Sequence, residues 1–208
     1  NPTEIPCTKS ALSQARYKLK EDFFEDWNKV LVKSYYCEND ERVLLWNGFH
    51  LHGIDGTTAY LPDHEELRAR FGEQSNQYGS VPMARILGRY DLLNNILIDT
   101  KIDSIHKGEN ALTIEQLDKV PDNVLSIYDR NFASFEVIYE HEKRNLPFLM
   151  RSKLTANNVV KEFVKSKSTS AIVKFYATET AVDSLKKRGF TLTKKNSVTI
   201  RLIKVELE

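Results

Sequence analysis

Hydrophobic residues recur every three or four positions in the N-terminal stretch, from Thr8 to about Tyr36. That spacing is the period of a helix with one apolar side, and Thr8 and Ser10 are residue types that cap helix N-termini. We therefore predict one or two amphipathic helices in this stretch.

The pattern changes to that of β-strands after residue 42. Residues 43–46 and 49–54 are largely apolar, and a further run over 57–61 follows Asp55-Gly56, a dipeptide typical of tight turns. These runs predict a hairpin with the Asp55 carboxylate at its tip.

Strands and helices alternate in the middle of the chain. A polar helix is expected over 63–71 and a loop over 72–80, then strands over 84–92 and 95–105. A helix over 109–117, a strand over 124–128, a helix over 134–143 and a strand over 147–150 complete the order. This order indicates an α/β fold whose mixed sheet begins antiparallel and has flanking helices.

The C-terminal part differs in texture. Residues 159–164, 171–176 and 197–207 are β-branched, alternating and Lys-rich, with a turn at 186–190. The chain thus divides into an N-terminal helical segment (1–40), a mixed α/β part (41–152) and a basic, β-rich insertion (153–208).

Charge follows the same division. Residues 1–150 hold 17 Lys and Arg against 24 Asp and Glu, a net −7, while residues 151–208 hold 13 against 5, a net +8. A basic part on an acidic body favours a polyanion as partner, because Lys and Arg displace counterions from phosphates. A solvated, Lys-rich surface would give the same count.

Length and composition set the remaining bounds. A chain of 208 residues can bury one core without disulfides. Cys7 and Cys37 stand far apart with no CxxC motif, so we expect two packed thiols in a reducing cytoplasm. The sequence has neither an apolar run of membrane-spanning length nor a signal pattern, so no membrane association is expected. Because the chain begins at Asn1, we expect a fragment of a longer product.

Two aspartates stand at the ends of strands that we expect to be buried, Asp55 and Asp129. A carboxylate is costly to desolvate, and a shared divalent cation would account for both. Strands also often end in Asp because Asp favours turns.

The Asp55-Gly-Thr57 motif occurs in haloacid-dehalogenase phosphatases too, but Gly53 stands where their nucleophile belongs, which excludes an aspartyl-phosphate. His50 and His52 alternate away from Asp55 along the strand, so we interpret them as structural.

Several short motifs, in order, resemble IS4-type DDE transposases over about residues 8–152. They are Ser10–Arg16, Gly53-Ile-Asp-Gly-Thr57, Leu61-Pro-Asp63, Phe71-Gly72, Pro82-Met-Ala-Arg85, Tyr90-Asp91, Asp99, Glu109, Tyr128-Asp-Arg-Asn-Phe132 and Phe148-Leu-Met-Arg151. Each motif is weak alone, and their order carries the resemblance.

The resemblance implies an RNase H-like catalytic core in residues 41–152, with Asp55 and Asp129 as the first two members of an Asp-Asp-Glu triad. Such a triad holds two Mg²⁺ (or Mn²⁺) ions for in-line phosphodiester displacement. It also implies transposon ends and target DNA as partners, a homodimer on DNA, and a cytoplasmic, nucleoid-associated location in a bacterium.

The third carboxylate is missing from the pattern. The family's Tyr-x-x-Arg-x-x-x-Glu helix motif does not occur here, and the late candidates Glu206 and Glu208 end a run that alternates as a strand. We therefore expect these residues to bind metal weakly and to cut no DNA by themselves. The basic part after Lys153 stands where the family carries a β-rich insertion.

Six basic residues are candidate DNA contacts. Arg130 follows Asp129, and Arg151 and Lys153 follow a strand expected near the active face; Lys186, Lys187 and Arg188 form a basic turn. Two functions stay open: a transposase that cleaves and joins DNA, and a catalytically inactive, transposase-derived DNA-binding protein.

Overall fold

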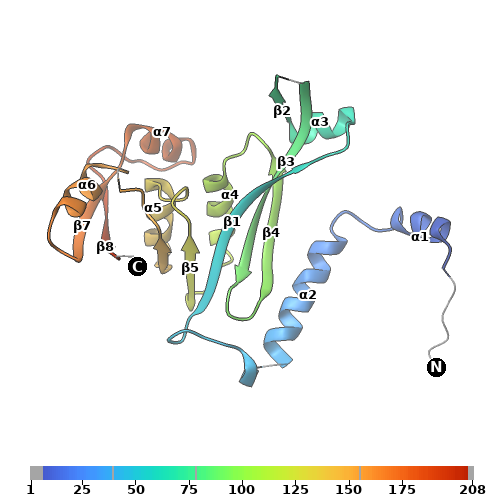
Figure 1. Ribbon diagram of the computed structural model, residues 1–208, viewed down its shortest axis with the longest axis horizontal. Helices are drawn as coiled ribbons and strands as arrows, with labels where there is room; N and C mark the ends of the chain where they lie inside the picture. Colours follow the sequence, from blue (N-terminus) through green and yellow to red (C-terminus); the bar gives the residue numbers. More distant parts are fainter. Residues whose placement is uncertain (1–6, 39, 78, 155, 206–208) are drawn as a thin grey trace.

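The computed structural model describes residues 7–38, 40–77, 79–154 and 156–205, and its centre is a mixed six-stranded sheet (Figure 1). Five segments precede the second strand: the helices α1 (Lys9–Arg16), α2 (Phe23–Glu38) and α3 (Glu65–Phe71), the short 3-10 helix η1 (Asp40–Arg42) and the strand β1 (His50–Tyr60). The rest of the central part comprises β2 (Glu73–Asn76), β3 (Gly79–Asp91), β4 (Ile96–Ser104), α4 (Glu109–Leu117), β5 (Val124–Tyr128), α5 (Phe135–Lys143) and β6 (Phe148–Met150). Within residues 84–150, this order of strands and helices is the one that the sequence predicts.

Strand β1 is the axis of the sheet. It pairs antiparallel with β3 on one side and parallel with β5 on the other. Beyond β3 lies β4, antiparallel, and beyond β5 lies β6, parallel. The sheet therefore has an antiparallel half formed first along the chain and a parallel half whose strands alternate with helices.

One face of the sheet carries the core. Ile54, Leu87 and Tyr128 alternate onto this face and pack with Leu112 of α4 and with Phe132. Helix α5 joins the same layer through His141, which contacts the Tyr128 hydroxyl. Together α4 and α5 cover this face.

The opposite face keeps large apolar side chains in solvent. Tyr90, Leu97 and Leu149 are 38%, 43% and 53% exposed, and Ile102 is 60% exposed. Register and strand alternation place all four on the side of the sheet that Asp55 occupies. No described helix fills that side as α4 and α5 fill the other.

The predicted N-terminal helices are present as α1 and α2, and neither buries a residue. Helix α2 runs beside β4 (Figure 1), where the Asn28 side chain donates to the backbone carbonyl of Leu97. Cys7 and Cys37 lie in this outlying part and are both exposed, so the expectation of packed thiols was wrong. No helix in the described ranges has the length and apolarity needed to cross a bilayer.

The predicted hairpin tip at Asp55-Gly56 is also wrong. β1 runs unbroken through both residues, since it is paired with β3 from His52 to Tyr60. The turn lies instead at Asn47-Gly48, where both residues have positive φ angles of 49° and 84° and Trp46 and Phe49 exchange backbone hydrogen bonds. Asn-Gly is the dipeptide that such a turn favours.

The C-terminal part holds as much helix as strand, which corrects the β-rich expectation. It comprises α6 (Asn158–Lys165), β7 (Ser170–Tyr176), α7 (Glu179–Lys187) and β8 (Ser197–Ile203). The run 159–164 was predicted as a strand because of its valines, yet Val160 and Phe163 stand three residues apart on a buried helical side, and the Asn157 side chain caps the helix. Leu185 and Val198 of this part pack on Phe135 and Ile138, so α5 is shared by both layers.

Candidate functional site

The two predicted metal-binding aspartates lie side by side. Ile54 of β1 is directly paired with Tyr128 of β5 in parallel register, and Asp55 and Asp129 are the next residues on their strands. Neighbouring strands lie about 4.8 Å apart, so side chains that follow paired residues on one side of a sheet can approach a common cation. The structure thus brings together residues that are separated by more than seventy positions in the chain.

Both carboxylates are exposed and lack a cationic partner. Asp55 Oδ1 accepts a hydrogen bond from the Gly56 backbone, and Asp129 Oδ1 accepts one from the Asn131 backbone. Across the described residues, neither aspartate forms an ion pair with Lys, Arg or His. Two adjacent, unneutralised carboxylates are a donor set for a hard divalent cation, which prefers oxygen ligands.

Hydrogen bonds to a buried histidine of α5 hold the end of β5, directly before Asp129, in place. The Tyr128 hydroxyl donates to His141 Nε2 at 2.8 Å, and His141 Nδ1 donates to the Leu146 carbonyl at 3.1 Å. Burial lowers the pKa of His141 to about 4, so its ring is neutral and holds the tautomer that both bonds require. Burial also raises the pKa of Tyr128 above its ordinary range, which keeps the hydroxyl protonated.

The absence of a side chain at Gly56, next to Asp55, leaves room for the Glu109–Arg85 ion pair to pack against β1. A Cβ on Gly56 would lie 2.6 Å from the Glu109 carboxyl carbon. Glu109, the first residue of α4, pairs with Arg85 of β3 at 2.8 Å, and Arg85 also donates to the Ile105 carbonyl. Glu109, whose role could not be derived from sequence, therefore anchors α4 against the sheet behind Asp55.

The predicted DNA contacts fall into two groups. Arg151 follows Met150, which is paired with Tyr128, so it continues the row formed by Asp55 and Asp129. Arg130 and Lys153 are exposed near the same edge of the sheet.

The second group lies at the end of α7. Lys186 and Lys187 are exposed. Arg188 Nη1 lies 3.0 Å from Oε1 of the fully buried Glu140, at ion-pair distance although without hydrogen-bond geometry. Arg188 is thus engaged within the fold, and the two lysines are the freer cations.

A third carboxylate does not join the pair within the described ranges. No further Asp, Glu, His or Cys there completes a three-ligand group with Asp55 and Asp129. Glu206 and Glu208 lie outside the described residues. The open, apolar face of the sheet is the side from which another carboxylate has free access to Asp55.

A second polar cluster, missed by sequence, lies near the start of β1. His50, His52 and Asp91 place one ligand atom each within 4.8 Å of the others. Asp91 is fully buried, and Tyr36 of α2 donates to its Oδ2 at 2.6 Å. The His-x-His motif was visible in the sequence, but the cross-strand pairing of His52 with Asp91 was not.

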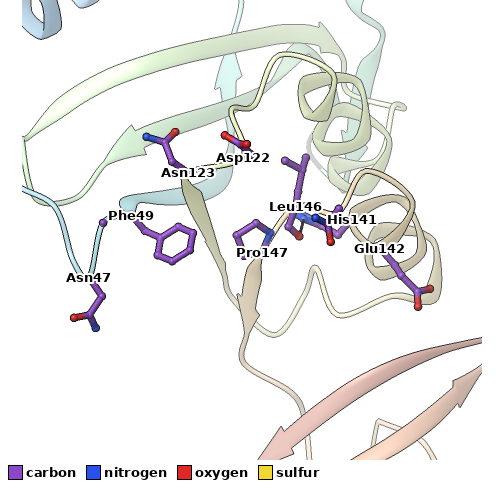
Figure 2. A pocket seen from close by; sticks show the side chains of 10 residues that line it. Asn47, Phe49, Asp122, Asn123, His141, Glu142, Leu146 and Pro147 are labelled. Carbon is purple, nitrogen blue, oxygen red and sulfur yellow. Dashed lines mark hydrogen bonds between the residues drawn. The ribbon is translucent and has the colours of Figure 1, made fainter.

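A hollow of the surface lies far from the aspartates. Figure 2 shows it lined by Asn47, Phe49, Asp122, Asn123 and Pro147, among others, with His141 bonded to Leu146 at its wall. Asn123 precedes β5 whereas Asp129 follows it, so this hollow opens at the other end of the strand. It therefore contributes nothing to the carboxylate pair.

Comparison with protein-family models gives no match. Among curated proteins, the chain is similar to "Putative transposase InsZ" of Escherichia coli (strain K12), with 26% identity over 137 residues. That match covers 62% of this chain and 44% of the relative, so this chain spans less than half of that protein in the alignment. Among solved structures, a crystal structure of NurA bound to dAMP and manganese aligns with a TM-score of 0.16 and 11% identity, over 95% of this chain and 59% of that one. A likeness at that score carries no argument about fold or function.

Proposed function

We propose that this chain is part of the catalytic region of an IS4-type DDE transposase, which cleaves and joins DNA at insertion-sequence ends. One observation supports the proposal: Asp55 and Asp129 directly follow paired residues of the parallel strands β1 and β5, and both are exposed and have no cationic partner among the described residues. The similarity to a putative transposase supports it, as does the order of antiparallel and then parallel strands expected of an RNase H-like core.

Asp55 and Asp129 would hold Mg²⁺ or Mn²⁺. The chemistry such an ion would supply when bound is activation of an attacking hydroxyl and stabilisation of the leaving oxygen of a phosphodiester. The residues of this chain contribute position and charge: Tyr128 and His141 fix one carboxylate, and the Glu109–Arg85 pair supports the strand of the other.

We further propose that the third carboxylate lies outside the described residues and reaches the pair from the open face of the sheet. Residues 1–208 alone then bind metal weakly and do not cut DNA. Two carboxylates leave most of a divalent cation's coordination sphere to water, which limits its affinity.

The experiment compares residues 1–208 with the longest open reading frame that contains them, in a Mg²⁺- or Mn²⁺-dependent assay of supercoiled DNA nicking. The longer protein is expected to cut, and Asp55→Asn or Asp129→Asn to abolish cutting, while Asp122→Asn at the other end of β5 serves as the matched control. Cutting that survives in Asp55→Asn would overturn the proposal. A longer protein that binds DNA and does not cut would support the inactive, DNA-binding alternative.

DNA contact is proposed for Arg130, Arg151, Lys153, Lys186 and Lys187, with Arg188 committed in part to Glu140. Replacing Lys186 and Lys187 together by Ala should weaken DNA binding and reduce the salt slope by about 0.9 per lost phosphate contact. Arg188→Ala should weaken DNA binding and should also lower the free energy of unfolding, because it removes the ion-pair partner of the buried Glu140. Titrations at several salt concentrations, with chemical unfolding of the same variants, separate the two effects.

A further inference from the structure

From the cluster at the start of β1 we infer a second metal site, in which His50, His52 and Asp91 bind one Zn²⁺ ion. It is separate from the carboxylate pair, because His52 and Asp55 lie on opposite faces of β1 and His50 stands five residues before Asp55. The inference does not depend on the proposed transposase function.

The donor set and its placement fit a transition metal. His50 and His52 share one side of β1, and His52 is the direct cross-strand partner of Asp91 on β3. Two imidazole nitrogens and one carboxylate oxygen are ligands that Zn²⁺ takes, whereas Mg²⁺ prefers oxygen alone.

The spacing is close to that of a bound ion. Ligand atoms about 2.0–2.1 Å from a tetrahedral Zn²⁺ lie roughly 3.3 Å from one another. His50 Nδ1 is hydrogen-bonded to Asp91 Oδ2 at 3.2 Å, a contact that the ion would replace, and His52 Nε2 is 3.9 Å from the same oxygen. A shift of well under 1 Å would bring this second distance to the expected value.

The buried and unpaired ring of His52 is the feature that points to a bound ligand. It is 5% exposed, and within the described part of the chain neither of its ring nitrogens has a hydrogen-bond partner. A buried polar atom left unpaired is destabilising, and a metal bond would give one of the two ring nitrogens a partner.

The surroundings orient the carboxylate. The Asp91 Oδ1 atom accepts hydrogen bonds from the backbone of Leu93 and Asn94, and Oδ2 accepts them from the Tyr36 hydroxyl and the Asn94 side-chain amide. Outer partners of this kind hold metal ligands in place. His50 is only partly buried, with 18% of its side chain exposed, and it offers the ion a path in. A bound ion would tie α2, through Tyr36, to the sheet.

The experiment titrates the EDTA-treated chain with Zn²⁺ by calorimetry and follows thermal unfolding. The chain is expected to bind one Zn²⁺, its Tm rising with free Zn²⁺, and Co²⁺ to give the visible spectrum of a tetrahedral site. His52→Leu should lose that ion and its Tm gain, with affinity lower by roughly 100-fold or more, beyond the roughly 10–100-fold expected for Tyr36→Phe.

Control variants separate loss of the ion from loss of the fold. His52→Leu removes two unpaired nitrogens, so its metal-free form should fold with equal or higher Tm. His64→Ala, at an exposed position, and the Asp55→Asn/Asp129→Asn double variant should both keep the ion. Absence of a Zn²⁺-dependent Tm gain in the unmodified chain, or an equal gain in His52→Leu, would overturn the inference.

Discussion

The carboxylates near the start and near the middle of β1 lie in opposite environments. Near its start, Asp91 of the neighbouring strand is fully buried and receives hydrogen bonds from Tyr36, Leu93 and Asn94. Near its middle, Asp55 and its neighbour Asp129 are exposed, and their hydrogen bonds come from backbone amides close by in the chain.

The difference separates a carboxylate that the metal-free fold already holds by many hydrogen bonds from two that it holds only by nearby backbone amides. Hydrogen bonds to a buried carboxylate hold the fold together, so its removal should be costly. Exposed, adjacent carboxylates repel each other, and a bound cation offsets that repulsion. Stability measurements on matched Asp→Asn variants therefore distinguish the two roles.

The largest effect is expected for Asp91→Asn. The variant weakens hydrogen bonds to a charged, fully buried group, each about 1.5–3 kcal/mol, so the free energy of unfolding should fall by about 4 kcal/mol. Urea unfolding followed by tryptophan fluorescence measures the change. A loss below about 1 kcal/mol, the size typical of an exposed site, would remove the contrast with Asp55.

Acid should destabilise the fold through His141. Its pKa is about 4 in the folded chain, below the ordinary 6.5. Between those values the unfolded chain takes up a proton that the folded chain refuses, so stability falls from pH 6.5 to 4 and levels off below. At about 1.4 kcal/mol per unit of pKa, the loss reaches about 3 kcal/mol.

Burial lowers the pKa of His52 to about 4 as well, so His141→Gln should remove about half of the total loss, and His64→Gln at an exposed position should remove none. Urea midpoints measured from pH 7 to pH 4 give the two profiles. Equal pH dependence in both variants would show that His141 is not the group responsible.

Gly56→Ala should cost about 1–2 kcal/mol, because the new methyl group displaces the Glu109 carboxyl and weakens its pair with Arg85. The double variant Gly56→Ala/Glu109→Ala should be no less stable than Glu109→Ala alone. Additive losses in that mutant cycle would argue against the contact.

The smallest effect is expected at the candidate site itself. Asp55→Asn and Asp129→Asn should each change the free energy of unfolding by less than about 1 kcal/mol, and relief of repulsion favours a small gain. The same urea experiment detects it. A loss as large as that of Asp91→Asn would identify the pair as structural.

Sequence patterns predicted the elements of the central part well because their periods are local. The helix over 109–117 and the strand over 124–128 agree with the structure at both ends. The turn at Asp55-Gly56 was wrong because a turn dipeptide is also tolerated inside a strand when a neighbour, here Glu109, needs the space above the glycine.

Contacts across strands were beyond local patterns. The adjacency of Asp55 and Asp129 rests on a parallel register that only the fold sets, although both residues were identified from their motifs. The partnership of His50 and His52 with Asp91 and Tyr36 also depends on register and on the docking of α2. Likewise, the sequence predicts Arg188 as a DNA contact, whereas in the structure its guanidinium lies at ion-pair distance from the buried Glu140.

A Mn²⁺ titration of the isotope-labelled chain, read by paramagnetic broadening of backbone amides, tests most directly whether Asp55 and Asp129 share a cation. The account predicts that Gly56, Arg130 and Arg151 broaden first, in the unmodified chain and in Asp122→Asn, and that Asp55→Asn and Asp129→Asn each abolish this effect. Broadening that persists at these amides in either variant, or that never centres on them, would contradict it.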